Sequence, residues 1–120
     1  MEGIFVIGAD TNVGKTVISA GLLKAMHGFR KATYWKPVQT GTIVGDDTKD
    51  VKTVTQCPPE CFMEPAYRFP DPMAPRNAAK NWGKTIDLAA IVEQFKKRPN
   101  PERFLVVEGA GGLLVPMNDE

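Results

Sequence analysis

The feature that most constrains the fold lies near the N-terminus, where a short apolar run leads into a glycine-containing loop and then a helical pattern. Residues 4–7 read Ile-Phe-Val-Ile, which is typical of a strand buried on both faces of a parallel sheet. From Lys15 onward apolar residues recur at helical spacing, and Gly28 stands where a C-cap is expected. The sequence therefore predicts one strand–loop–helix unit, with the loop over residues 8–14.

The loop itself resembles a phosphate-binding P-loop. Residues 8–16 read Gly-Ala-Asp-Thr-Asn-Val-Gly-Lys-Thr, with one residue more before Gly-Lys-Thr than the usual spacing. Between a strand and a helix, backbone N–H groups and the positive helix end converge on an anion. We expect Gly14 to permit close backbone approach, Lys15 to reach the outer phosphates of a nucleoside triphosphate, and Thr16 to ligate magnesium.

Two further predicted strands each end in a charged residue. Residues 32–38 form the first, and Pro37 limits its pairing, which places Lys36 at its carboxyl end. Residues 104–107 repeat the buried-strand pattern, and Glu108 follows, with four small residues after it. Glu108 is therefore a candidate magnesium ligand. Lys36 is a candidate cation that would lie beside a transferring phosphoryl group. A solvated strand-end acid and an ordinary surface lysine remain the alternatives.

Helical patterns and a proline-rich stretch separate these strands. A short helix is expected over residues 48–56, before Pro58 and Pro59 stop it. Residues 57–75 carry six prolines, and we expect this least regular stretch to be a binding loop or an interface. Thr85 is expected to cap a later helix, which ends before Pro99. Its predicted core-facing stripe is Leu88, Ile91, Val92 and Phe95.

The alternation of strands and helices predicts the fold class. It favours an α/β fold, P-loop NTPase-like and doubly wound around a mostly parallel sheet. The length of 120 residues fits a single domain over residues 1–120. A hydrophobic content of 42% and a charged content of 24% argue against disorder.

Charge and cysteine usage exclude several classes of function. The net charge of +1 without a basic run gives no footprint for nucleic acid. No apolar run is long enough for a bilayer and no leader pattern opens the chain, so we expect a soluble, cytoplasmic protein with no membrane partner. Cys57 and Cys61 lack a second ligand pair for zinc, and His27 lies far away in sequence. We interpret them as two reduced thiols.

Three segments together resemble the dethiobiotin synthetase family. They are residues 8–16, the run Lys-Pro-Val-Gln-Thr-Gly over residues 36–41, and the run Val-Glu-Gly-Ala-Gly-Gly over residues 107–112. The order of the segments and their positions at strand ends match as well. The resemblance implies an ATP-dependent cyclo-ligase of biotin biosynthesis that joins carbon dioxide to 7,8-diaminononanoate. The products would be dethiobiotin, ADP and phosphate.

The resemblance also implies roles for individual residues. Lys36, together with Lys15, would stabilise the carbamate and the developing phosphate charge. Thr11, Thr40 and Gly111 would contact the substrate. Thr16, Glu108 and Asp50 would hold Mg²⁺, although Asp46 and Asp47 remain alternatives to Asp50. The implied ATP-binding residues are Asn12, Val13, Gly14, Lys15, Thr16, Val17, Glu108, Gly109, Ala110 and Gly111.

One segment departs from the family pattern, and the chain is short for the family. In the run Met-Ala-Pro-Arg-Asn-Ala-Ala from Met73, the family commonly has His after the proline, whereas this chain has Arg76. The role of Arg76 therefore stays open. Family members continue well past this length, with adenine recognition, further strands and much of a homodimer interface in their later part. We expect an N-terminal portion of the family fold that is inactive alone.

Two other P-loop classes remain as alternatives. An amidoligase of cobalamin synthesis shares the carboxylate-activating strategy, but residues 36–41 argue against it. A partitioning-type ATPase switch usually carries a second lysine early in the loop, where this chain has Ala9 and Asp10. Nucleotide-driven dimerisation without ligase turnover would favour that switch.

Overall fold

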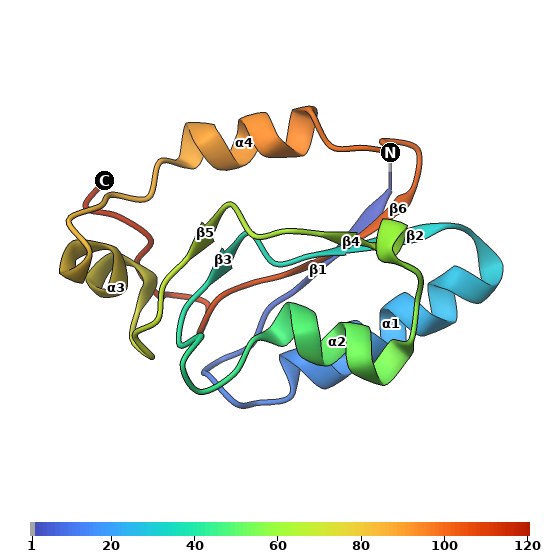
Figure 1. Cartoon of the computed structure of the whole chain (residues 1–120), viewed down its shortest axis with the longest axis horizontal. Helices are drawn as coiled ribbons and strands as arrows, with labels where there is room; N and C mark the ends of the chain where they lie inside the picture. The colour runs from blue at the N-terminus through green and yellow to red at the C-terminus, as the bar shows by residue number, and fades with distance from the viewer. Residues whose placement is uncertain (1) are drawn as a thin grey trace.

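Four parallel strands form the main sheet of the computed structural model, which describes residues 2–120. Their order across the sheet is β1-β6-β2-β4, so the first and last strands of the chain are neighbours (Figure 1). The strands are β1 (Gly3–Val6), β2 (Ala32–Trp35), β4 (Phe62–Met63) and β6 (Phe104–Glu108). A second, two-stranded parallel sheet consists of β3 (Val38–Gln39) and β5 (Tyr67–Arg68).

Helices cover both faces of the main sheet. The helices α1 (Lys15–Phe29) and α2 (Asp47–Thr55) lie on one side of the strands, and α4 (Leu88–Lys96) lies on the other (Figure 1). The short α3 (Pro75–Asn81) and the 3-10 turn η1 (Pro59–Cys61) complete the described elements. This arrangement confirms the predicted α/β fold with helices on both faces of a parallel sheet.

The alternation of side chains along each strand divides the core into two layers. Tyr34 and Val106 face α1 and α2, where they pack with Leu23 and Val51 in one buried cluster. Trp35 and Leu105, their neighbours in sequence, belong to a second cluster with Met63, against which Ile91 and Phe95 of α4 pack. Trp35 and Phe95 stack with ring centroids 6.4 Å apart.

The prediction that residues 4–7 form a strand buried on both faces is wrong in its burial. The strand β1 ends at Val6, and Phe5 is 61% exposed. In the described structure β1 lies at the edge of the sheet and pairs only with β6. An apolar run alone does not tell an edge strand from a central one, because both contain β-prone residues.

Three predicted helix boundaries also need correction. The helix α1 continues through Gly28 to Phe29, and its C-cap is Arg30, whose N–H bonds to the carbonyl of Met26. The N-cap of α4 is Asp87, not Thr85, because the Asp87 carboxylate accepts a hydrogen bond from the backbone N–H of Ala89. The helix α2 spans Asp47–Thr55, so it begins and ends one residue earlier than the predicted range of residues 48–56.

The helix stripes are less buried than predicted. On α1 the buried side chains are Lys15, Ser19, Ala20 and Leu23, whereas Val17 and Ile18 are exposed. On α4 only Ile91 and Phe95 pack against the core, and Leu88 and Val92 remain about half exposed. Core packing therefore explains Ile91 and Phe95 on α4, and on α1 it involves Leu23 together with the partly buried Leu22 and Met26.

The stretch from residue 57 to residue 75 is more regular than predicted. It contributes η1, β4 and β5, and β4 extends the main sheet next to β2. The predicted strand over residues 32–38 is divided at Lys36 and Pro37, because β3 belongs to the second sheet. The helix α3, with Pro75 in its first turn, was not predicted, although proline is favoured there. None of the helices described within residues 2–120 is long and apolar enough to cross a membrane.

Candidate functional site

The loop between β1 and α1 has the backbone of an anion-binding loop. Gly14 caps α1 with φ 99°, a conformation that side chains other than glycine rarely adopt. Asn12 also has a positive φ of 55°. The ammonium group of Lys15 donates to the carbonyl of Asp10 at 2.7 Å, so this buried lysine lies across its own loop. The first turn of α1 carries no acidic residue, and its positive end is available to an anion.

The glycines after β6 bring a second loop against the first one. A Cβ atom on Gly112 would lie 2.6 Å from the carbonyl oxygen of Ala9, so only glycine fits this contact without a shift of the phosphate loop. The backbone N–H of Gly109 bonds to the carbonyl of Val6 at 3.0 Å. These contacts fix the two loops at the carboxyl end of the sheet.

Strand register places Lys36 next to Glu108. Trp35 pairs with Val107 across β2 and β6, and the following residue on each strand points to the α1/α2 face. The Lys36 ammonium lies 3.4 Å from Oε1 of Glu108, and the same oxygen accepts from the Thr16 hydroxyl at 3.0 Å. Lys36 also forms an ion pair with Asp47 at the start of α2. Four side chains from four segments therefore meet at one point.

Tyr34 holds the other oxygen of Glu108. Its hydroxyl donates to Glu108 Oε2 at 2.9 Å, and both side chains are buried. Burial, and next the negative charge of Glu108, raise the pKa of Tyr34 above its ordinary value, so the phenol remains a donor. Glu108 thus has one oxygen toward Thr16 and Lys36 and one toward the core.

The three acids around α2 occupy different positions. Asp46 caps the helix by accepting from the backbone N–H of Lys49 at 3.2 Å, and it pairs with Arg68. Asp47 pairs with Lys36 beside Glu108. Asp50, the predicted metal ligand, is exposed, and its carboxylate makes no hydrogen bond within residues 2–120. The geometry therefore favours Asp47, one of the alternatives, over Asp50.

An open cleft of about 1210 Å³ joins these groups. It extends from the phosphate loop along α1 and α2 and reaches the turn before α3. Val13 and Gly109 do not line it, although both belong to the predicted site. The predicted residues that line the cleft are Thr11, Asn12, Gly14, Lys15, Thr16, Val17, Lys36, Thr40, Asp50, Glu108, Ala110 and Gly111.

The donor set at the head of the cleft suits magnesium. Thr16, Glu108 and Asp47 offer hard oxygen atoms, the type that Mg²⁺ prefers. Within residues 2–120 no three His, Cys, Asp or Glu side chains form a metal-binding group. A magnesium ion here would therefore take its remaining ligands from phosphate and water, as is usual for Mg²⁺ beside a nucleotide.

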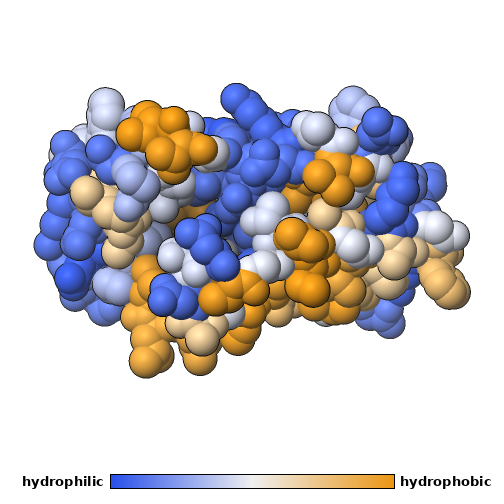
Figure 2. Space-filling view, turned by 90° about the horizontal axis from the view of Figure 1, so that it is seen from below, coloured by the Kyte–Doolittle hydropathy of each residue, from blue (hydrophilic) through white to orange (hydrophobic). Residues whose placement is uncertain are grey.

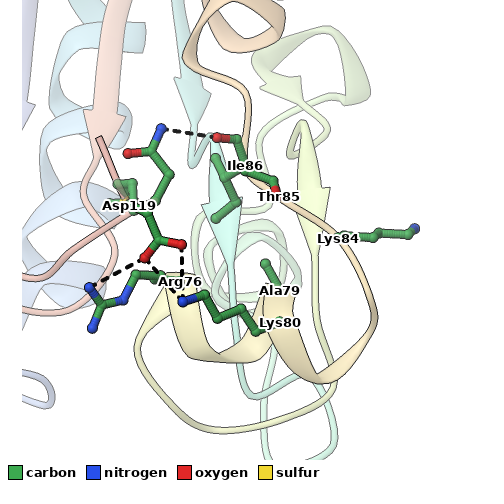
Figure 3. Close-up of a pocket in the computed structure, with 9 residues that line it drawn as sticks. Arg76, Ala79, Lys80, Lys84, Thr85, Ile86 and Asp119 are labelled. Atoms are coloured by element: carbon green, nitrogen blue, oxygen red, sulfur yellow. Dashed lines mark hydrogen bonds and ion pairs between the residues drawn. The ribbon is translucent and has the colours of Figure 1, made fainter.

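Arg76 lies away from this cluster. Figure 3 shows Arg76 and Lys80 of α3 pointing to Asp119. Lys80 lies 3.0 and 3.1 Å from the two carboxylate oxygens, and Arg76 lies 3.6 Å from one of them. The pocket that these side chains line has a volume of only about 10 Å³, which is room for about one water. Arg76 connects α3 to the last described residues, and the structure gives it no place in the cleft.

The two cysteines are free, and they lie outside the cleft. Cys61 is fully buried, and its Sγ lies 3.6 Å from Nδ1 of His27, despite the distance between these residues in sequence. Burial raises the pKa of the Cys61 thiol, against the opposing effect of Arg103. We find no sequence signal that could have brought His27 to Cys61.

Two residues of the site were missed from sequence. The sequence predicts only that Tyr34 lies in a strand, although its position two residues before Lys36 places both side chains on the same side of this extended segment. Gln39 is buried in the cleft wall, where its side-chain amide oxygen accepts from the backbone N–H of Asp47 at 3.1 Å. Gln39 thereby helps to fix the start of α2, a long-range contact that spacing alone could not predict.

Comparison with known proteins shows the family to which the chain belongs. A family model described as an AAA domain matches residues 2–120. The ATP-dependent dethiobiotin synthetase of Paramagnetospirillum magneticum is 43% identical over 120 residues, which cover 99% of this chain and 53% of that protein. The corresponding enzyme of Nitrobacter hamburgensis is 45% identical over 114 residues, or 95% of this chain and 50% of the relative.

A longer relative gives a similar match. The biotin biosynthesis bifunctional protein of Bordetella avium is 42% identical over 119 residues, which cover 98% of this chain and 24% of that protein. The chain therefore spans about half the length of the dethiobiotin synthetases that it matches. The chain belongs to the AAA domain family, and it is a homologue of the N-terminal portion of ATP-dependent dethiobiotin synthetases.

Proposed function

We propose that this chain carries the ATP-, magnesium- and diamine-binding part of an ATP-dependent dethiobiotin synthetase. The observation that carries the proposal is the convergence of Lys36, Thr16 and Glu108 beside the phosphate loop. A cation, a hydroxyl and a carboxylate at the end of an anion-binding loop suit transfer of a phosphoryl group. The similarity to dethiobiotin synthetases supports 7,8-diaminononanoate and carbon dioxide as the acceptor substrates.

The phosphate loop would bind the nucleotide. Residues Asn12 to Thr16 lead into and open α1, so their backbone N–H groups would bind the phosphates at the helix N-terminus, where the helix dipole favours negative charge. Lys15 would exchange its bond to the Asp10 carbonyl for the outer phosphates. Ala110 and Gly111, which line the cleft, would form the opposite wall, because their loop packs against the phosphate loop through Gly112. Gly109 would act only by holding this loop to the Val6 carbonyl.

Thr16, Glu108 and Asp47 would hold Mg²⁺ beside the nucleotide phosphates. When bound, the ion would neutralise charge on the transferring phosphoryl group. The chain's own contribution is to hold the ligands in place: Glu108 is 1% exposed and is bonded through both oxygens. We propose Asp47 as the second carboxylate in preference to Asp50, since Asp47 contacts Lys36.

Lys36 would act at the centre of the reaction. One substrate amine captures carbon dioxide as a carbamate. The carbamate oxygen then accepts the γ-phosphoryl group of ATP, whose bond to the leaving ADP breaks, and the product is a mixed anhydride. The second amine attacks the activated carbon, closes the ureido ring and releases phosphate. Such chemistry needs positioning and charge neutralisation rather than a protein nucleophile. Thr11, Thr40 and Gly111 line the cleft at positions suited to contact the diamine.

Calorimetric titration tests this proposal. The chain is titrated with diaminononanoate in bicarbonate buffer, with and without Mg-ATP, and compared with Lys15→Ala and Lys36→Ala variants. We expect nucleotide-dependent binding of the diamine that both substitutions weaken. Lys31→Ala is the matched control, because Lys31 is an exposed lysine that does not line the cleft. Nucleotide binding without diamine binding would contradict the assignment of the substrate.

We also propose a cytoplasmic homodimer, as the family resemblance implies. Free Cys57 and Cys61 are compatible with a reducing compartment. Hydrophobic side chains gather on the face seen in Figure 2, the side on which α1 and α2 lie. Val17 on α1 is 75% exposed, as is Val54 on α2, and exposed apolar patches favour a protein partner. Light scattering on the purified protein tests the assembly, and a monomer at all concentrations would contradict it.

A further inference from the structure

The Glu108 carboxylate is held asymmetrically, and Tyr34 is the cause. Oε1 faces the cleft, where it accepts from Thr16 at 3.0 Å and lies 3.4 Å from the Lys36 ammonium. Oε2 faces the core and accepts from the Tyr34 hydroxyl at 2.9 Å. Both Glu108 and Tyr34 are almost completely buried, so water cannot take the place of the phenol without a rearrangement.

The position of Tyr34 is itself fixed by packing. Tyr34 lies in β2 opposite Val106 of β6, two residues before Glu108, so both side chains point to the α1/α2 face. Its ring lies in the main core cluster and meets Phe62 edge-on, with ring centroids 6.4 Å apart. The phenol oxygen is therefore placed by the core rather than by the cleft.

This asymmetry has a consequence for metal choice. Mg²⁺ requires near-ideal octahedral geometry with ligands at about 2.0–2.1 Å, whereas Ca²⁺ accepts carboxylates through both oxygens at about 2.3–2.6 Å. The buried phenol occupies one lone pair of Oε2 and keeps this oxygen turned toward the core, so Oε1 is the oxygen that the carboxylate presents to an ion in the cleft. Such a ligand suits Mg²⁺ and disfavours the two-oxygen binding open to Ca²⁺.

We propose that Tyr34 is a positioning residue that restricts Glu108 to one-oxygen ligation and so makes the site select Mg²⁺ over Ca²⁺. The inference rests on the proposed function, since it takes Glu108 as a magnesium ligand. It adds a residue and a property, metal selectivity, that the proposed reaction does not require. Tyr34 acts only through Glu108 and is given no contact with the nucleotide.

Binding measurements on a Tyr34→Phe variant test the proposal. The dissociation constant of a non-hydrolysable ATP analogue is measured by calorimetry in saturating Mg²⁺ and in saturating Ca²⁺. Loss of a charge-assisted hydrogen bond should reduce the ratio of Mg²⁺-supported to Ca²⁺-supported affinity by about tenfold. Tyr67→Phe is the matched control, because the Tyr67 hydroxyl bonds to the backbone of Asp87 outside the cleft.

The outcomes separate this inference from the proposed function. Wild-type binding that does not depend on a divalent ion would overturn both. Metal-dependent binding in the wild type with an unchanged ion ratio in Tyr34→Phe would overturn the inference alone. A uniform loss of affinity with both ions would also overturn it, because that is the effect of general structural damage.

A spectroscopic measurement covers the case in which Tyr34→Phe does not fold. The sequence contains two tyrosines, so the Tyr67→Phe variant labelled with 3-fluorotyrosine reports on Tyr34 alone. We expect the ¹⁹F resonance to shift when Mg²⁺ is added to the nucleotide complex, because the phenol is bonded to a carboxylate that gains the ion. A resonance that Mg²⁺ leaves unchanged would overturn the inference.

Discussion

Lys36 lies 3.4 Å from Glu108, although the two residues are 72 positions apart in the chain. The contact follows from the order of the sheet, because β2 and β6 are neighbours and both side chains stand at their carboxyl ends. Lys36 is 5% exposed and Glu108 is 1% exposed. Lys36 also pairs with Asp47, so one buried cation neutralises two acids that point to the same place.

Removal of Lys36 should therefore destabilise the protein as well as its site. A Lys36→Met variant leaves Glu108 as a buried charge without its cation, and we expect the free energy of unfolding to fall by about 3 kcal/mol. A Lys36→Met, Glu108→Gln double variant should recover part of this loss, since it removes the uncompensated charge. Urea unfolding measures both effects, with Lys31→Met as the control for an exposed lysine. Equal losses in the single and double variants would contradict the coupling.

The acids of α2 should differ in their effect on nucleotide binding. Asp47→Asn removes a carboxylate that contacts Lys36, and we expect it to weaken magnesium-dependent binding of an ATP analogue by at least about tenfold. Asp50→Asn changes an exposed carboxylate on the next turn of the helix and should leave binding near the wild-type value. Calorimetry with matched magnesium concentrations checks the pair. A larger effect of Asp50→Asn would restore the prediction made from sequence.

The positions of Lys36 and Glu108 at the carboxyl ends of neighbouring strands were predictable from sequence, and so was the phosphate-loop backbone at Gly14. A glycine-rich loop between a β-prone run and a helical pattern fixes the local structure of Gly14, Lys15 and Thr16. Lys36 and Glu108 are charged residues at the ends of β-prone runs, and this pattern predicts that both lie at the same edge of a parallel sheet. These inferences depend on local pattern and on the rule that parallel strands align their carboxyl ends.

Other features depend on contacts that no local pattern contains. The exposure of Phe5 follows from the position of β1 at the sheet edge, and strand order is a property of the whole fold. The choice between Asp47 and Asp50 depends on how α2 begins, which the Gln39 side chain and the Asp46 cap determine together. The contact between Tyr34 and Glu108 depends on the register of β2 with β6 and on the burial of both side chains.

Glycine substitutions should separate backbone strain from helix propensity. Gly14→Ala meets no atom within 4 Å of the new Cβ but must adopt φ 99°, and we expect a loss of about 1–2 kcal/mol together with weaker nucleotide binding. Gly28→Ala lies inside α1 with open space around it. Because alanine is a better helix former than glycine, Gly28→Ala should stabilise the protein by about 0.5–1 kcal/mol. Thermal unfolding checks both signs, and a destabilised Gly28→Ala would favour the C-cap role predicted from sequence.

The two thiols should react at different rates with a thiol reagent. Cys61 is fully buried, and burial raises its pKa, so both access and thiolate fraction are low near neutral pH. Cys57 is only partly buried. We expect a fast phase that a Cys57→Ser variant abolishes and a slow phase that tracks unfolding, measured as absorbance against time with an aromatic disulfide. A fast phase that survives in Cys57→Ser would contradict the burial of Cys61.

Substitution at the start of α4 should distinguish its observed cap from the predicted one. The Asp87 carboxylate accepts from the backbone N–H of Ala89 at 2.8 Å, and Asp87→Ala leaves this N–H without its partner. We expect a loss of about 1 kcal/mol in the free energy of unfolding. Thr85 makes no capping bond to α4 in the described structure, so Thr85→Ala should change stability by less than about 0.5 kcal/mol. Urea unfolding of both variants decides between them, because a cap at Thr85 requires the opposite ranking.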